Sequence, residues 1–131
     1  MLAGGIAQEN INFMGFVDDN IKKLCYSAAD IFVLPSRSEG FGIVLLEASA
    51  YGLPLVVSDL EVFRSVVQDG YNGLFTDRED EQDLASKIMS LLDNDDLRVK
   101  MGENAIERVQ EFTWERVADE TLTLYSKLLK S

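Results

Sequence analysis

The chain has 131 residues, of which 47% are hydrophobic, and a formal net charge of −11 at pH 7. This length predicts one domain, residues 1–131, and the apolar fraction is that of a globular protein. The negative charge argues against nucleic acid and anionic membranes as partners, because both are bound through basic patches. The sequence contains no histidine, which removes imidazole bases and most zinc sites.

A single cysteine, Cys25, allows no intrachain disulfide and fits a reducing cytoplasm. It falls in a predicted helix, where we expect a small buried thiol. The carboxylates Asp93, Asp95 and Asp96 are interpreted as a solvated loop and helix cap, so no metal is expected. No apolar run approaches the length of a membrane span, and the first residues lack the regions of a signal peptide.

The apolar pattern alternates between strands and helices in the first part of the chain. Strands are expected at residues 11–15, 31–34, 55–57 and 73–76, helices at residues 18–29 and 43–50, and a short helix or turn at residues 62–67. Asp18 or Asp19 caps the first helix, whose apolar face contains Ile21, Leu24, Cys25 and Ala28. This alternation predicts an α/β fold with a Rossmann-like parallel sheet and right-handed crossovers.

The last part of the chain is predicted to be helical, with helices at residues 80–92, 95–112 and 113–129. We expect these C-terminal helices to pack on the sheet. Thr113 is the expected N-cap of the last helix. Phe112 and Trp114 are interpreted as the aromatic joint between the last two helices, with packing favoured over a binding role for Trp114.

Residues 39–47 carry the chemistry, because two carboxylates flank a glycine-bearing turn that follows a buried strand. Gly40 and Gly42 remove side chains where a ligand can approach the backbone and where positive φ is needed. The amides of Phe41, Gly42 and Ile43 lie at the first helical turn, where the helix dipole favours a phosphate.

The two carboxylates suit hydroxyl groups rather than phosphate, since like charges repel. Glu47 follows Ile43 by one helical turn and can bind a vicinal diol, whose hydroxyls donate to its two oxygens. Glu39, before the turn, can do the same for a second polyol. A polyol, a diphosphate and another polyol in a row are the outline of a nucleotide sugar.

The same residues resemble a known family, the retaining GT-B glycosyltransferases of family 4 (glycosyl transferases group 1). The resemblance covers roughly residues 10–130 and rests on four motifs: Phe13-Met14-Gly15-Phe16-Val17, Pro35-Ser36 with Glu39-Gly40-Phe41-Gly42 and Glu47, Gly52-Leu53-Pro54-Leu55-Val56-Val57, and Asp69-Gly70-Tyr71-Asn72-Gly73-Leu74.

The resemblance implies an enzyme that transfers a sugar from a UDP-, GDP- or ADP-sugar to an acceptor with retention, in polysaccharide or glycolipid biosynthesis. It places a catalytic contact to the donor sugar on Glu39 and the ribose contact on Glu47. Gly40, Phe41, Gly42 and Ile43 then bind the diphosphate and sugar. No cofactor or metal is implied, and the location is cytoplasmic, with peripheral attachment to the inner membrane face left open for the full protein.

The resemblance also indicates what is missing. Nothing before Phe13 matches the family's basic pair, which neutralises the leaving diphosphate, or its N-terminal acceptor domain. We therefore expect a truncated C-terminal donor-binding domain, inactive alone. Arg37 and Arg64 are candidates to reach phosphate from the loops.

In the doubly wound order 3-2-1-4-5-6, the strands at residues 11–15 and 31–34 are the third and fourth, and the first two are missing. The hydrophobic edge at residues 31–34 then predicts a homodimer or a first segment rearranged to cover it. Two alternatives to a transferase stay open: a non-catalytic nucleotide- or sugar-binding module, and another α/β nucleotide-binding domain whose Glu pair is only structural.

Overall fold

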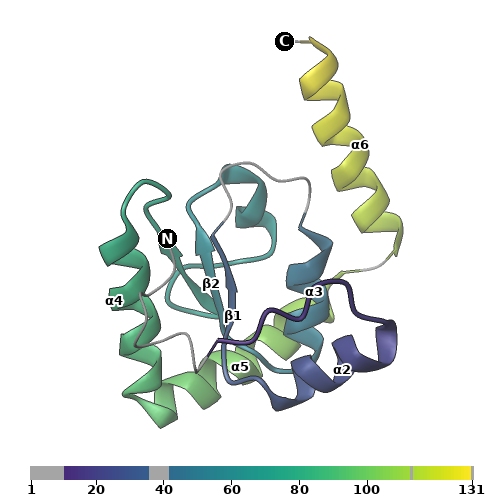
Figure 1. Ribbon diagram of the computed structural model, residues 1–131. Helices are drawn as coiled ribbons and strands as arrows, with labels where there is room; N and C mark the ends of the chain where they lie inside the picture. Colours follow the sequence, from purple (N-terminus) through teal and green to yellow (C-terminus); the bar gives the residue numbers. More distant parts are fainter. Residues whose placement is uncertain (1–10, 36–41, 113, 131) are drawn as a thin grey trace.

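The computed structural model describes residues 11–35, 42–112 and 114–130. A parallel sheet lies at its centre, with helices packed against it (Figure 1). The sheet has three strands in the order β1 (Phe32–Leu34), β2 (Leu55–Ser58) and β3 (Gly73–Thr76). The predicted α/β fold with a parallel sheet is therefore confirmed.

The described residues also form five α-helices and one 3₁₀ helix. They are α2 (Asp19–Ala28), α3 (Ile43–Ala50), η2 (Glu61–Ser65), α4 (Glu81–Leu92), α5 (Asp95–Val109) and α6 (Trp114–Lys130). Each predicted helix is present, although α5 ends three residues early. The chain turns there through bonds from the Glu111 and Phe112 N–H groups to the Arg108 and Val109 carbonyls.

The central strand β2 is buried on both faces, as a continuous apolar strand in a parallel sheet requires. Leu55 and Val57 pack with Leu45 of α3 and with Phe63 of η2 on one face. On the other face, Val56 packs in a second core cluster with Leu91 of α4 and Met101 of α5. The sheet is thus enclosed between two layers of helices.

Side-chain caps fix where three of the helices begin. Asp18 accepts a hydrogen bond from the Ile21 N–H at 2.9 Å, which confirms the predicted cap of α2. Asp80 accepts from the Gln82 and Asp83 N–H groups at the start of α4, and Asn94 accepts from the Leu97 N–H at the start of α5.

The predicted strand at residues 11–15 is wrong. The segment has no regular secondary structure and joins no sheet, and the side chains of Phe13, Met14 and Phe16 are exposed. A strand needs partners for its backbone N–H and C=O groups, and the described residues provide no neighbouring strand for this segment. Residues 11–15 therefore do not cover the outer edge of β1 by strand pairing.

The expectation that the Cys25 thiol is buried in α2 is also wrong. None of the residues of α2 is fully buried, and Leu24 is 65% exposed. Cys25 is exposed rather than buried. The helical spacing of these residues is correct, but a pattern of spacing does not itself supply the surface against which a helix packs.

The last two helices behave differently from each other. Leu97, Met101 and Ala105 of α5 lie in or against the core, as their spacing predicts. Helix α6 does not pack on the sheet as expected, but projects away from the rest of the molecule (Figure 1). Thr113 and the side chain of Trp114 lie outside the described part of the chain, so their predicted roles stay predictions.

Candidate functional site

Helix α3 begins at a glycine that is held in the left-handed region. Gly42 has φ +83° and is buried, and it offers no side-chain cap to the helix. A Cβ at this position would lie 2.9 Å from Cε1 of Phe63, in the core. The positive φ expected of Gly42 is therefore confirmed, and the N–H groups at the start of α3 have no side chain of residue 42 over them.

Most of the predicted turn lies outside the described residues. This applies to Glu39, Gly40 and Phe41, and to Arg37. Their proposed contacts stay predictions. The structure places Gly42, Ile43 and Glu47 together on the start of α3, with Ile43 and Glu47 one turn apart.

Glu47 is half-buried and has a cationic partner. Its Oε2 lies 2.9 Å from the ammonium nitrogen of Lys22 on α2, and the two side chains are 33% and 41% exposed. A half-buried carboxylate on a largely apolar helix needs a partner, and the sequence does not identify Lys22 as that partner. Lys22 belongs to a different helix, so no sequence spacing links it to Glu47.

A cavity of about 390 Å³ lies between α2 and α3 at this ion pair. It is lined by Asp19, Lys22, Lys23, Tyr26, Glu47, Ala50 and Tyr51. The rings of Tyr26 and Tyr51 are stacked, with their centroids 5.4 Å apart. The cavity therefore combines an aromatic wall with two cations and two carboxylates.

The ion pair affects the titration of its neighbours. The hydrogen bond to Glu47, followed by its charge, raises the pKa of Lys22 above 10.5. Partial burial, followed by the charge of Glu47, raises the pKa of Tyr26 above 10.0. Lys22 is therefore a cation, and Tyr26 a neutral hydroxyl group, at physiological pH.

Two further cavities open at the carboxyl ends of the strands, where parallel sheets bind ligands. One, of about 720 Å³, is lined by Pro35, Ser58 and Thr76 from the three strand ends, and also by Ile11 and by residues of α4. The other, of about 690 Å³, contains Asp59, Arg64 and Phe75.

Arg64 does not share a cavity with Glu47. Its guanidinium pairs with Asp59 and lies over the ring of Phe75, 4.5 Å from the centroid. A phosphate would have to compete with the Asp59 carboxylate for it.

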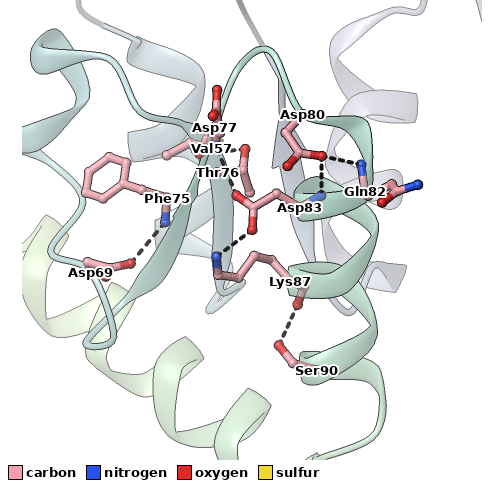
Figure 2. Close-up of polar contacts among 10 residues, drawn as sticks. All are labelled: Val57, Asp69, Phe75, Thr76, Asp77, Asp80, Gln82, Asp83, Lys87 and Ser90. Atoms are coloured by element: carbon pink, nitrogen blue, oxygen red, sulfur yellow. Dashed lines mark hydrogen bonds and ion pairs between the residues drawn. The ribbon is translucent and has the colours of Figure 1, made fainter.

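Polar contacts connect β3, at the edge of the sheet, with its neighbours and with the start of α4 (Figure 2). Thr76 Oγ1 donates to the Val57 carbonyl, and Asp69 accepts from the Phe75 N–H. Asp83 accepts from both the Asp77 N–H and the Lys87 ammonium, at 2.9 and 3.0 Å. No group of three or more metal-ligating side chains is arranged to hold an ion in the part of the chain that the structure describes.

A parallel sheet with cavities at its strand ends, beside a helix that begins at a left-handed glycine, places the chain in the class of α/β domains with a parallel sheet, in which ligands bind at the carboxyl ends of the strands. The sequence profile of glycosyl transferases group 1 matches residues 6–108. The chain belongs to this family.

Similarities to known proteins agree with the fold and the family. The chain is 39% identical to a phosphatidyl-myo-inositol mannosyltransferase of Mycobacterium leprae over 130 residues, which is 98% of this chain and 34% of that protein. The chain thus spans about a third of the length of that relative.

Two solved structures resemble the fold. One is the C-terminal domain of a glycosyl transferase group 1 family protein from Francisella tularensis, with a TM-score of 0.69 and 31% identity, covering 76% of this chain and 51% of that one. The other is Anabaena Alr3699/HepE in complex with UDP, with a TM-score of 0.73 and 26% identity, covering 94% and 33%.

Proposed function

We propose that the chain is the C-terminal, donor-binding part of a retaining GT-B glycosyltransferase resembling family 4. In the complete protein this part holds a nucleotide sugar whose sugar is transferred to an acceptor. The observation that carries the proposal is the position of Glu47, at the mouth of a cavity and one turn inside a helix that begins at left-handed Gly42. Membership of the family supports the same function.

The donor is a nucleoside diphosphate sugar, with UDP, GDP and ADP as the candidate nucleotides. The complex of Alr3699/HepE with UDP supports a nucleotide ligand. Glu47 accepts hydrogen bonds from the ribose diol, and the backbone amides near Gly42 and Ile43 face the diphosphate. We assign the donor sugar to Glu39, as the catalytic contact, and to Gly40 and Phe41.

The acceptor is supplied from outside these 131 residues. The relative from Mycobacterium leprae is named a phosphatidyl-myo-inositol mannosyltransferase, which supports a lipid acceptor. No helix in the described ranges is long and apolar enough to cross a bilayer. Stabilising the departing diphosphate is a large part of such catalysis, and nothing before Phe13 matches the basic pair that does so in the family. We therefore expect no turnover from the isolated chain.

Titration of the chain with UDP, GDP and ADP, and with their glucose and mannose conjugates, tests donor binding by calorimetry. We expect one nucleotide to bind best. Glu47→Ala should weaken the affinity for that nucleotide by about 10- to 100-fold, which corresponds to the free energy of hydrogen bonds to a charged group. Glu103→Ala, an exposed acid on α5, is the matched control. The proposal fails if no nucleotide binds at millimolar concentration.

A further inference from the structure

Lys22 has an unusual position for a surface lysine. It lies on α2, a helix with no fully buried residue, yet its ammonium reaches across to the half-buried carboxylate of Glu47 on α3. Both side chains also line the cavity of about 390 Å³. The ion pair is therefore part of the cavity wall.

The pair has hydrogen-bonding capacity left for a ligand. An ammonium has three N–H donors, and Lys22 uses one of them on Oε2 of Glu47. The carboxylate accepts only, whereas each hydroxyl of a diol both donates and accepts. An ammonium beside a carboxylate thus offers a donor and an acceptor side by side, which matches two neighbouring hydroxyl groups better than a carboxylate alone.

The charges of the cavity identify the kind of group that it suits. Lys22 and Lys23 provide two positive charges, and Asp19 and Glu47 provide two negative charges. The formal charges cancel, so the cavity has no excess of cations for a phosphate. A neutral, hydroxyl-rich group fits this balance.

We propose that Lys22 and Glu47 bind the ribose diol of the nucleotide as one unit. Lys22 holds the carboxylate in place and donates a hydrogen bond to one hydroxyl oxygen. This inference rests on the proposed function, because it assigns the diol to a nucleotide donor. As a structural tether alone, an ion pair this exposed would contribute little, since such pairs contribute about 0–1 kcal/mol.

Binding of ribonucleotides and their dideoxy counterparts tests the inference. The probes are UDP and GDP, each compared with its 2′,3′-dideoxy form, and the variants are Lys22→Met and Lys22→Arg in the full 131-residue chain. We expect Lys22→Met to weaken the ribonucleotide about 10-fold, the value of a charged hydrogen bond, and to leave the dideoxy form unchanged. Lys22→Arg keeps the donors and should retain a clear preference for the ribonucleotide.

The matched control is Lys23→Met, which removes the same charge from the same helix and cavity wall. It should affect the ribo and dideoxy forms equally. Thermal unfolding of each variant checks that α2 and α3 remain in place.

Three results would overturn the inference. Equal weakening of ribo and dideoxy nucleotides by Lys22→Met would assign Lys22 a structural or general charge role. Equal affinity of the unmodified chain for the two forms would remove the diol contact, and with it the ribose role of Glu47, but would leave nucleotide binding by the chain intact. Failure of the unmodified chain to bind any of the four probes would overturn both.

Discussion

Gly42 is the residue on which the start of α3 depends, because its backbone and its surroundings both exclude a side chain. We expect Gly42→Ala to reduce the free energy of unfolding by about 1–2 kcal/mol for the left-handed conformation, and by about 1–3 kcal/mol more for the clash with Phe63. Urea denaturation measures the change.

Gly70 provides the matched control for Gly42. It has φ +80°, but a Cβ there would meet nothing within 4 Å. Gly70→Ala should therefore show the conformational cost alone. Equal losses in the two variants would contradict the contact between residue 42 and the Phe63 ring.

Asp83 links stability to pH. The hydrogen bond from the Asp77 N–H, followed by that from Lys87, lowers the pKa of Asp83 below 3.8 (Figure 2). A carboxyl group whose pKa is lower in the folded state stabilises the fold above its unfolded pKa, and this contribution is lost as pH falls through the folded value. Asp83→Asn should therefore be less stable than the unmodified chain at neutral pH, with the difference vanishing below 3.8.

Denaturation of both proteins across the acid range measures this window. Asp96→Asn, on the exposed first turn of α5, removes the same charge and controls for net charge. A difference between Asp83→Asn and the unmodified chain that stays constant through the acid range would contradict the assignment.

Individual residues could be predicted from the sequence where their role is local. The left-handed turn at Gly42 and the Asp18 cap involve neighbours within one helical turn, so a short motif identifies them, whereas the contact of residue 42 with Phe63 is not visible in that motif. Lys22 could not be found in this way, because its contact with Glu47 depends on how two separate helices pack.

At the scale of elements, close packing of α5 depends on Gly102. A Cβ at this position would lie 2.1 Å from the carbonyl oxygen of Gly52, in the turn after α3. We expect Gly102→Ala to be less stable than the unmodified chain, because overpacking costs about 1–3 kcal/mol and exceeds the roughly 1 kcal/mol that alanine adds to helix propensity.

Chemical denaturation of Gly102→Ala tests this close approach. Glu103→Ala, an exposed position on the same helix, is the control and should change stability little. An alanine at position 102 that leaves the protein as stable as before would show that α5 and the turn can separate at no cost.

Elements are predictable from sequence to the extent that their partners are present. The strands β1, β2 and β3 were placed correctly because each has an adjacent strand in the sheet. Residues 11–15 carry a comparable apolar pattern but have no strand to pair with, and they remain irregular. Periodicity reports which face a segment could bury, whereas pairing decides whether it becomes a strand.

At the scale of the whole molecule, the outer edge of β1 has no neighbouring strand among the described residues. In the part of the chain that the structure describes, the Phe32 N–H donates to the Pro54 carbonyl, on the side of β2. Backbone groups alternate in direction along a strand, so Val33 directs its N–H and C=O toward the outer edge. No described strand pairs with that edge, and an open apolar edge favours pairing with another chain.

Pairing of two chains through the β1 edge is opposed by the repulsion between their negative charges. Salt weakens this repulsion and therefore favours pairing. Two copies of the chain each carry a net charge of −11, and their repulsion is screened as the Debye length falls from about 10 Å at 0.1 M salt to about 3 Å at 1 M. We expect weak dimers that strengthen with salt, measured as a rise of the sedimentation coefficient with concentration. The Val33 amide should then exchange more slowly, because pairing through β1 protects it. A monomer at 1 M salt, or association without protection of Val33, would exclude a dimer formed through this edge.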